Sequence, residues 1–471
     1  MEVITGDGLP VYSWAPDLEE GALRQALNCA LLSPAHHHVA VMADGHQGYG
    51  VPIGAVLALR DAISPYAVGN DIGCGMALVP TTVARDELLA PVRTRSGGQG
   101  QAARDEIMGW VQASVPSGLG DGRGGGRSGG RGGGRGGDGG ERRPRAQGDD
   151  VDARPLLDAA YAALEEAAPA AGVELSTSQG TDASKGKPLD RAGFVRRGLD
   201  QLGTLGSGNH FIELVAGPEG DVWVLLHSGS RGVGGLVCNN FHRMALRHCE
   251  KTAQAVPDPG LAWLPVAGTD RWARVGRCYE RALRAALGYA EANRASMLRA
   301  VGAVVERRFP DAVRWDDAID IHHNDATLEE HFGEQVWVHR KGAVKAAAGA
   351  PTITPGSMGT GSYLGRGRGN AESFCSCSHG AGRVLSRGRA RRELSLQDEL
   401  ARISGAGGKV FASQTEAVLD EMPGAYKDLD TVMACQGDLV ETVRRFTPLA
   451  TYKGSDSPRR GRGRWRPGEE R

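Results

Sequence analysis

The chain has few of the features that mark membrane or secreted proteins. No apolar run approaches the length of a membrane span, and no basic-then-apolar signal peptide opens the sequence, so we expect no membrane partner. The eight cysteines are scattered over 471 residues and do not form a disulfide framework, which favours a reducing, cytoplasmic setting. The formal net charge is only −1, so any nucleic acid would have to be bound by local basic patches.

Two segments have too little apolar content to form a core. Residues 118–140 contain fifteen glycines among 23 positions, interleaved with arginine. Such a stretch buries too little apolar surface to offset the entropy of ordering, so we predict a disordered Gly/Arg-rich insertion at 118–150. Residues 455–471 hold six arginines and Trp465, and we predict a basic disordered tail there. Segments of this kind either bind RNA through charge and stacking or serve as solvated linkers.

The rest of the chain is predicted to be one mixed α/β domain over residues 1–454, interrupted by the insertion. Its 40% hydrophobic content is ample for a large core. Residues 152–170 and 271–308 have helical spacing of apolar residues, and 222–226 and 335–339 read as short strands. The glycine-rich motifs fall just after or between such strands, where a rigid scaffold usually presents functional residues.

The most informative segment is residues 373–383, with the sequence SFCSCSHGAGR. Small neighbours let a charged group approach the His379 imidazole and the backbone amides closely, and Arg383 can hold phosphate oxygens through two parallel hydrogen bonds. This pattern indicates a histidine that handles phosphate and could act as a nucleophile. The alternatives are a buried histidine in a glycine-rich turn, or a zinc site formed by Cys375, Cys377 and His379.

A second glycine-rich turn, residues 69–76, places Asp71 and Cys74 three positions apart. A carboxylate oxygen and a thiolate sulfur so close can face one cation, and a thiolate can also bridge two. This mixed ligand set suits Mn²⁺, Zn²⁺ or Fe²⁺ better than Mg²⁺. The alternative is a tight turn that buries a cysteine.

Residues 203–213 crowd polar side chains into a strand-like run that ends in Asn209, His210 and Glu213. Buried polar groups need partners, and metal ligation by His210 with nucleotide contacts by the other two would supply them. A satisfied core histidine is the alternative interpretation.

Two further histidine motifs have the same character. His227 follows the predicted strand 222–226, and the Gly/Ser turn behind it offers backbone amides to an anion beside Arg231. In the pair His322-His323, neighbouring side chains point in different directions, so we expect only one of them to join a cluster.

The early run 42–54 contains Asp44 and His46, which could line the same cavity either as direct ligands or in turn and supporting roles. Across the chain, one aspartate, one cysteine and three histidines are enough for a two-metal centre. A fourth histidine then remains for covalent chemistry.

These motifs, taken together and in order, resemble those of the RtcB RNA ligases. The resemblance spans about residues 1–454 apart from the insertion, and it is specific because the motifs are long and collinear. They read MADGHQGYGVPIGAV, VGNDIGCGM, GTLGSGNHFIE, HSGSRG, HHN, HFGE, RKGAV, PGSMG, SFCSCSHGAGR, AYKD and YKG.

The resemblance implies a GTP-dependent RNA ligase with two Mn²⁺ ions in a dinuclear centre, built on a single mixed α/β domain. Such a ligase joins a 3′-phosphate or 2′,3′-cyclic phosphate end to a 5′-hydroxyl end in tRNA splicing or RNA repair, in some cases with an archease-like activator. It places the guanylylated histidine on His379. It places the metal ligands on Asp71, Cys74, His210, His227 and His323. The expected nucleotide contacts are Asn209, Glu213, Ser357, Tyr426 and Lys453, and the arginines Arg231 and Arg383 complete that set.

The chain departs from the family pattern at a few positions. Asn70 stands where many members have valine, and Ala43 and Gly45 flank Asp44 where the family has Pro-Asp-Val; neither change removes an expected ligand. The motif YKG usually ends the chain, whereas here the sequence continues beyond Gly454 to Arg471, which puts the contact of Lys453 with the nucleotide in doubt.

Two functions from other classes use the same residues differently. A metallohydrolase would use the metals without a covalent step at His379, and only the ligase should form a stable protein–GMP adduct. A non-catalytic RNA-binding protein acting through its Arg/Gly segments would need no ordered Asp/Cys/His set.

Overall fold

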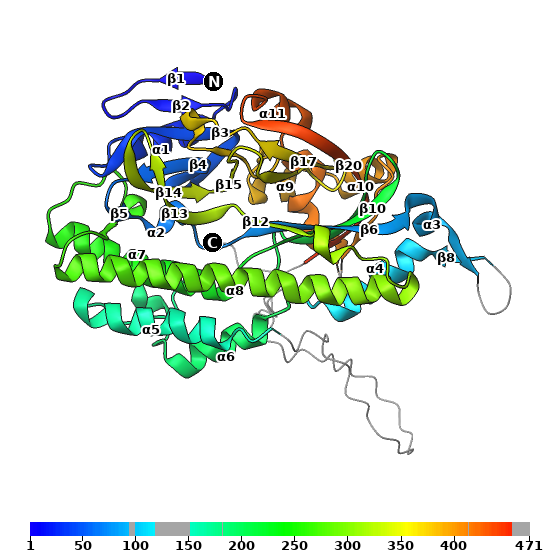
Figure 1. Cartoon of the computed structure of the whole chain (residues 1–471), viewed down its shortest axis with the longest axis horizontal. Coiled ribbons are helices and arrows are strands. Elements are labelled where there is room, and N and C mark those ends of the chain that lie inside the picture. Colours follow the sequence, from blue (N-terminus) through cyan, green and yellow to red (C-terminus); the bar gives the residue numbers. More distant parts are fainter. Residues whose placement is uncertain (94–98, 118–150, 181, 413, 455–471) are drawn as a thin grey trace, which may run out of the picture.

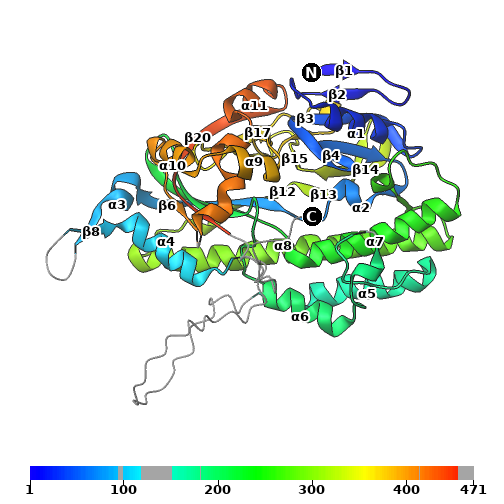
Figure 2. The same ribbon diagram turned by 180° about the vertical axis from the view of Figure 1, so that it is seen from behind.

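The fold is described by a computed structural model that covers residues 1–93, 99–117, 151–180, 182–412 and 414–454. The predicted insertion at 118–150 and the predicted tail at 455–471 lie outside the described residues. Two large sheets lie on one side of a layer of long helices, and a second helical layer covers the far side of that one (Figure 1 and Figure 2).

The two large sheets are mostly antiparallel. The first has the strand order β1-β2-β3-β4-β14-β13, and only β2 and β3 pair in parallel within it. Its strands are β1 (Glu2–Ile4), β2 (Val11–Ser13), β3 (Ala35–Tyr49), β4 (Val51–Leu59), β13 (Asn324–His331) and β14 (Glu334–Lys341).

The second sheet has the order β12-β6-β10-β9-β20-β17-β16, with β19 paired to β20. Its strands are β6 (Gly75–Ala84), β9 (Phe211–Ala216), β10 (Asp221–Ser228), β12 (Ile319–His322), β16 (Pro351–Pro355), β17 (Ser362–Gly367), β19 (Val410–Phe411) and β20 (Val440–Lys453). Every residue of β9 is buried, because both faces of the sheet are covered at its centre.

Three short ribbons complete the described strands. They pair β5 (Ala62–Ile63) with β11 (Leu264–Pro265), β7 (Pro91–Arg93) with β8 (Gln99–Ala102), and β15 (Ala343–Lys345) with β18 (Ser376–Ser378). The last of these ribbons carries His379 directly after β18.

The described helices include one very long element, α8 (Arg271–Arg308). Asp270 caps its first turn by accepting hydrogen bonds from the backbone N–H groups of Trp272 and Ala273, both at 2.8 Å. The other α-helices are α1 (Glu20–Ala30), α2 (Pro65–Val68), α3 (Arg85–Leu89), α4 (Ala103–Ser114), α5 (Arg154–Ala171), α6 (Arg191–Gln201), α7 (Arg231–Lys251), α9 (Arg387–Glu393), α10 (Leu396–Gly405) and α11 (Leu429–Cys435). Short 3-10 helices are η1 (Ala183–Lys185), η2 (Pro259–Leu261), η3 (Trp315–Asp317), η4 (Ala371–Ser373), η5 (Thr415–Glu421) and η6 (Pro423–Ala425).

The largest core cluster joins α5, α6, α7 and α8, whose apolar faces include Leu157, Phe194, Phe241 and Tyr279, all of them fully buried. A second cluster packs the C-terminal half of α8 against β6, β9 and β10. The long helix α8 therefore packs against both the other helices and the second sheet. This packing fixes the position of the central strands relative to the helices.

The predicted mixed α/β class is confirmed, and the predicted elements are present. The helix expected at 271–308 is α8, and the one expected at 152–170 is α5. The strand expected at 222–226 is longer than predicted, because His227 and Ser228 still pair with β6 as part of β10. The run 42–54 is mainly strand rather than turn, since β3 continues to Tyr49 through several register shifts.

Two further observations concern the cysteines and the helices. All eight cysteines are free thiols. In the part of the chain that the structure describes, no helix combines the length and apolar character that a membrane span requires.

Candidate active site

The Asp71–Cys74 turn connects α2 to β6 and is shaped by one glycine. Gly73 has φ of +71°, and a Cβ atom there would lie 2.8 Å from the Cβ of Ala290 in α8, so a larger residue would be both strained and crowded. The Cys74 N–H donates to the Asp71 carbonyl at 3.0 Å, which closes the turn. The two candidate ligand side chains therefore leave the same face of one tight turn.

The helix α8 holds this turn against the end of β10. The guanidinium of Arg294, which is fully buried, donates to the carbonyls of Gly73 at 2.6 Å and Ser228 at 3.1 Å and pairs with Asp320 at 2.6 Å. Its neighbour Asn293 donates to the Gly229 carbonyl at 3.0 Å. The loops that carry the predicted ligands are thus tied to one rigid helix.

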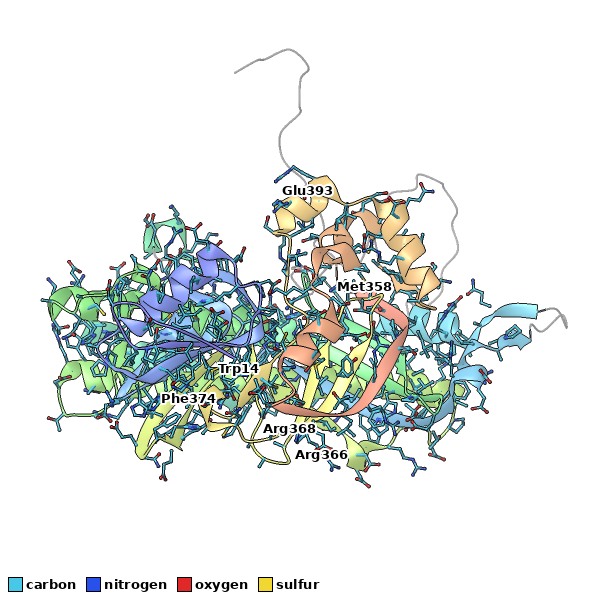
Figure 3. All side chains as sticks on the ribbon, turned by 90° about the horizontal axis from the view of Figure 1, so that it is seen from above. Trp14, Met358, Arg366, Arg368, Phe374 and Glu393 are labelled. Carbon is cyan, nitrogen blue, oxygen red and sulfur yellow. The ribbon has the colours of Figure 1, made fainter. Side chains whose placement is uncertain are left out.

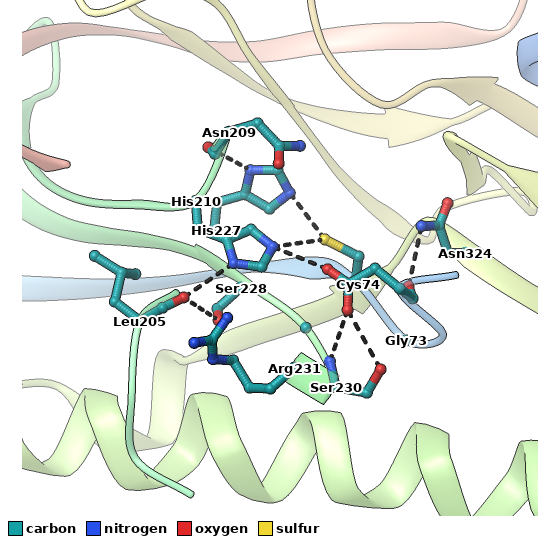
Figure 4. Close-up of polar contacts among 12 residues, drawn as sticks. Gly73, Cys74, Leu205, Asn209, His210, His227, Ser228, Ser230, Arg231 and Asn324 are labelled. Carbon is teal, nitrogen blue, oxygen red and sulfur yellow. Dashed lines mark hydrogen bonds and ion pairs between the residues drawn. The ribbon is translucent and has the colours of Figure 1, made fainter. Parts of the chain in front are cut away.

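The structure brings the five predicted metal ligands together, although they come from distant parts of the chain. Cys74 Sγ lies 3.4 Å from His210 Nε2 and 3.3 Å from His227 Nε2, as Figure 4 shows. Asp71 Oδ2 is 2.9 Å from His210 Nε2, and His227 Nε2 is 3.0 Å from His323 Nε2. They form two triads, Asp71–Cys74–His210 and Cys74–His227–His323, which share the cysteine.

Each of the three histidines turns its other ring nitrogen to an oxygen. His210 Nδ1 lies 2.9 Å from the Leu205 carbonyl, His227 Nδ1 lies 3.2 Å from the Asn209 carbonyl, and His323 Nδ1 lies 3.4 Å from Asn324 Oδ1. An oxygen at Nδ1 favours a proton there, which leaves the lone pair of each Nε2 directed into the cluster. Two such lone pairs facing each other at 3.0 Å cannot hydrogen-bond, but both can bind one cation.

The electrostatics of the cluster also fit a cation. Burial is the main cause that lowers the pKa of His227 and His323 well below the usual value, which favours neutral rings. Burial and the nearby Asp71 carboxylate raise the pKa of the Cys74 thiol well above the usual value. Burial alone would raise the pKa of Asp71, but the combined effect of the neighbouring His210, Cys74 and Arg231 outweighs burial and keeps the pKa low. A cation bound here would displace the Cys74 proton and gain a thiolate ligand.

His379 lies next to this cluster. The backbone N–H groups of Gly342 and Ala343 donate to the His323 carbonyl at 2.8 and 3.1 Å, and β15, which begins at Ala343, pairs with β18. As a result, the His323 and His379 rings are 4.8 Å apart, centroid to centroid.

A buried carboxylate orients the His379 ring. Asp44 Oδ2 lies 2.6 Å from His379 Nδ1 and accepts the His379 backbone N–H at 3.2 Å. Burial would raise the pKa of Asp44, but its contacts with His379, His46 and Ser378 together outweigh burial and hold the pKa low. Gly382 allows the close approach, because a Cβ there would come within 2.4 Å of the Asp44 carbonyl oxygen. Asp44 therefore favours a proton on Nδ1, which leaves the lone pair on Nε2.

His379 lines a cavity of about 330 Å³, a size that suits a nucleotide. Six of the seven predicted nucleotide contacts line it: Asn209, Glu213, Ser357, Arg383, Tyr426 and Lys453. The other lining residues are His46, Ile53, Phe211, His227, Pro355, Gly356, Met358, His379, Gly380, Ala381, Gly382, Arg387, Glu421 and Thr451.

The cavity holds two buried carboxyl groups of different character. Burial raises the pKa of Glu213 to about 7, and the Thr451 hydroxyl donates to its Oε1. Burial would also raise the pKa of Glu421, but the charges of Lys453 and the two arginines beside it outweigh burial and keep that pKa low. Lys453 Nζ lies 3.6 Å from Glu421 Oε2, so the side chain whose contact the sequence left in doubt points into the cavity.

Three sequence candidates lie elsewhere or act differently. Arg231 is absent from the cavity lining, and its Nε donates to Thr204 Oγ1 at 3.1 Å at the start of α7. His322 points away from the cluster, to Glu291 at 2.8 Å, so only His323 joins it. Within the described ranges, no ligand group combines Cys375, Cys377 and His379 as the zinc alternative required, and Cys377 packs into a hydrophobic core cluster.

Sequence reasoning missed part of this site. Of the alternatives for Asp44, a direct ligand or a residue in a turn or supporting role, its contact with His379 agrees with the supporting one, although the sequence did not indicate which residue it supports. Arg387 and Glu421 were not considered, although Arg387 follows the recognised HGAGR motif by four residues and Glu421 precedes AYKD. Their proximity to these motifs was the available signal.

Comparison with known proteins agrees with this geometry. The family described as "tRNA-splicing ligase RtcB" matches residues 25–454. The chain is 34% identical to the RNA-splicing ligase RtcB of Escherichia coli K12 over 461 residues, which cover 96% of this chain and 99% of that protein. It is 35% identical to the RNA-splicing ligase RtcB of Mycobacterium tuberculosis H37Rv (91% and 100% covered) and 32% identical to the tRNA-splicing ligase RtcB of Thermococcus kodakarensis (93% and 92% covered). The chain belongs to the RtcB family and is an RNA ligase.

Proposed function

We propose that this ligase is GTP- and Mn²⁺-dependent and joins RNA ends bearing a 3′-phosphate or 2′,3′-cyclic phosphate to 5′-hydroxyl ends. The observation that carries the proposal is the placement of His379, with its Nδ1 held by Asp44 at 2.6 Å and its ring 4.8 Å from His323 of the metal-ligand cluster. A nucleophile oriented by a carboxylate, beside a cation site and inside a nucleotide-sized cavity, suits transfer of a nucleotidyl group.

In the first step, His379 Nε2 attacks the α-phosphorus of GTP. A P–N bond forms as the bond to pyrophosphate breaks, and the proton on Nδ1 stays hydrogen-bonded to Asp44. The imidazole gains positive charge in this step, which the buried Asp44 carboxylate offsets at close range. The product is a guanylyl-histidine.

In the second step, an oxygen of the RNA 3′-phosphate attacks the same phosphorus. The P–N bond breaks, His379 returns to its neutral form, and the RNA carries a 3′-ppG end. A cyclic phosphate must first be opened by water to the 3′-phosphate. In the third step, the 5′-hydroxyl oxygen attacks the 3′-phosphorus, its proton passes to solvent, and GMP leaves. GTP is required because GMP is a far better leaving group than a phosphate oxygen.

The residues around the cavity would bind and orient these groups. Glu213, once ionised, offers acceptor oxygens to the N–H donors of guanine. The ion pair with Glu421 would hold the Lys453 side chain beside the same base. Arg383 donates to the Asp420 carbonyl and to Glu421, so its guanidinium is held in place at the cavity wall for phosphate oxygens.

The two triads would hold two Mn²⁺ ions, with Cys74 as the shared ligand. When bound, these ions would stabilise charge on the phosphoryl oxygens during in-line displacement. A set of three imidazoles, one carboxylate and one thiolate favours Mn²⁺ or softer ions over Mg²⁺.

Labelled GTP provides the direct test. Incubation of the metal-loaded protein with α-labelled GTP should give a protein-bound GMP that survives denaturation, and His379→Ala should abolish it while metal content is retained. His37→Ala, which removes an exposed histidine outside the site, should form the adduct as the wild type does. An adduct that survives in His379→Ala, or that never forms in the wild type, would overturn the proposal and favour metal-dependent hydrolysis.

The cellular role we propose is tRNA splicing or RNA repair in the cytoplasm. Ligation of a tRNA half ending in a 2′,3′-cyclic phosphate to one with a 5′-hydroxyl, with and without an archease-like activator, would test the substrate and the need for a partner.

A further inference from the structure

A row of three arginines leads out of the cavity. Arg383 and Arg387 both line the cavity, with side chains 16% and 48% exposed. Arg391 is absent from the lining and is 58% exposed. The three are spaced four residues apart, and the last two belong to α9. Four residues of helix advance about 6 Å, so Arg387 and Arg391 follow one another along one face of α9. Arg383 lies before the helix and is joined to this pair through Glu421.

Two buried carboxylates, those of Asp420 and Glu421, form ion pairs with the arginines of this row. Asp420 Oδ2 pairs with Arg387 Nη1 at 3.3 Å and with Arg391 Nη2 at 3.2 Å, so one oxygen holds both guanidiniums. Glu421 pairs with Arg387 at 2.9 Å and with Arg383 at 3.3 Å. In Figure 3, Glu393 marks the end of α9, which stands out from the sheets. The arginine side chains are thus ordered before any ligand arrives, which lowers the entropy cost of binding.

The carboxylates do not neutralise the row. The three arginines and Lys453 carry four positive charges, and Asp420 and Glu421 carry two negative charges, which leaves an excess of two positive charges in this cluster. Each carboxylate is almost fully buried behind the guanidiniums. The face that the row presents to solvent is therefore cationic, and a series of guanidinium groups suits the phosphates of a nucleic-acid backbone.

We propose that the backbone of the RNA strand bearing the 3′-phosphate leaves the cavity along this row, with Arg391 contacting a phosphodiester outside it. The inference rests on the proposed function. The end of that strand must reach His379, and Arg383 and Arg387 line the same cavity as His379, so the phosphates upstream of the end come next to the outer part of the row. Arg391 is a positioning residue for this strand and takes no part in the formation of the GMP adduct.

The test compares Arg391→Gln with the control Arg389→Gln. Arg389 lies on the same helix two positions away, is similarly exposed at 54%, and pairs only with surface Glu393 among the contacts of the described residues. Each variant removes one positive charge, and the two charges lie on opposite sides of α9. The probes are an RNA oligonucleotide with a 3′-phosphate and a 5′-phosphate, and the same sequence with hydroxyls at both ends.

Loss of one phosphate contact on a single strand should lower the slope of log K against log salt by about 0.7. Relative to about 1 M salt, where this electrostatic contribution vanishes, that slope corresponds to roughly fourfold weaker binding at about 0.15 M salt. We expect this loss in Arg391→Gln with the 3′-phosphate probe, with a higher KM for that strand in ligation and an unchanged kcat. Arg389→Gln should bind both probes as the wild type does, and both variants should form the GMP adduct at the wild-type rate.

Wild-type binding of the 3′-phosphate probe by Arg391→Gln, with unchanged salt dependence, would overturn the inference and leave the Arg391–Asp420 pair as a structural contact only. Equal losses in both variants would overturn it too, because they would indicate diffuse attraction to the helix. A loss confined to the hydroxyl-ended probe would assign the row to the other strand. Failure of the wild type to form the adduct would instead refute the proposed function, which keeps the two failures distinct.

Discussion

Replacing Asp44 by asparagine should slow guanylylation by about a thousandfold while leaving the protein folded. The change keeps the shape of the side chain and removes its charge. In the first step the His379 ring, whose Nδ1 lies 2.6 Å from Asp44 Oδ2, gains positive charge. For charge centres about 4 Å apart at an effective dielectric constant of about 20, the interaction contributes about 4 kcal/mol. Since about 1.36 kcal/mol corresponds to a tenfold change in rate, its loss gives roughly 10³.

The hydrogen bonds of Asp44 point in the same direction. Asp44 Oδ2 accepts from both the ring and the backbone of His379, whereas Oδ1 is buried and has no partner among the described residues. If the new amide nitrogen faces the ring, it stabilises the tautomer that protonates Nε2 and blocks attack. If it takes the place of Oδ1, it leaves buried N–H groups unpaired at a cost of about 1–3 kcal/mol. That cost is below the usual stability of a domain, so the variant should still fold.

The assay is single-turnover formation of the protein–GMP adduct from labelled GTP at saturating Mn²⁺, with a thermal melt and metal analysis of each preparation. The expected result is an adduct that forms about a thousandfold more slowly on a protein with wild-type metal content. A rate within tenfold of the wild type would refute the claim that Asp44 orients His379 and stabilises the positive charge that develops on its ring.

Three further outcomes are expected. Cys74→Ala should lose at least one metal ion per chain by elemental analysis and lose ligation in Mn²⁺; full activity would exclude a shared ligand at this position. Because burial raises the pKa of Glu213 to about 7, its carboxylate forms only as pH rises through that value, so the affinity for GTP should fall as pH drops below about 7. Glu213→Gln should remove that dependence in a titration of GTP binding. Removal of 118–148 and 455–471 should leave the adduct rate near normal but weaken RNA binding and its salt dependence; loss of the adduct would place one segment in the catalytic fold.

Local patterns determined a good part of the fold. The apolar spacing of 271–308 and the aspartate before it define α8 in full, because helix periodicity and capping act within a few residues. The predicted strands within β10 and β14 were found for the same reason, yet the end of β10 was misjudged. His227 is held in the strand by pairing with β6, which comes from a much earlier part of the chain.

The sequence by itself also determined which chemical groups are present, since glycine-flanked Asp, Cys and His residues indicated metal and phosphate chemistry before any fold was known. Only the tertiary structure decided which of these groups lie in contact with one another. It made Cys74 common to two triads, assigned Asp44 to His379 from far away in the sequence, and set Asp420 and Glu421 behind the arginine row. Such pairings arise where strands and helices from distant segments pack side by side, and no local spacing in the chain encodes them.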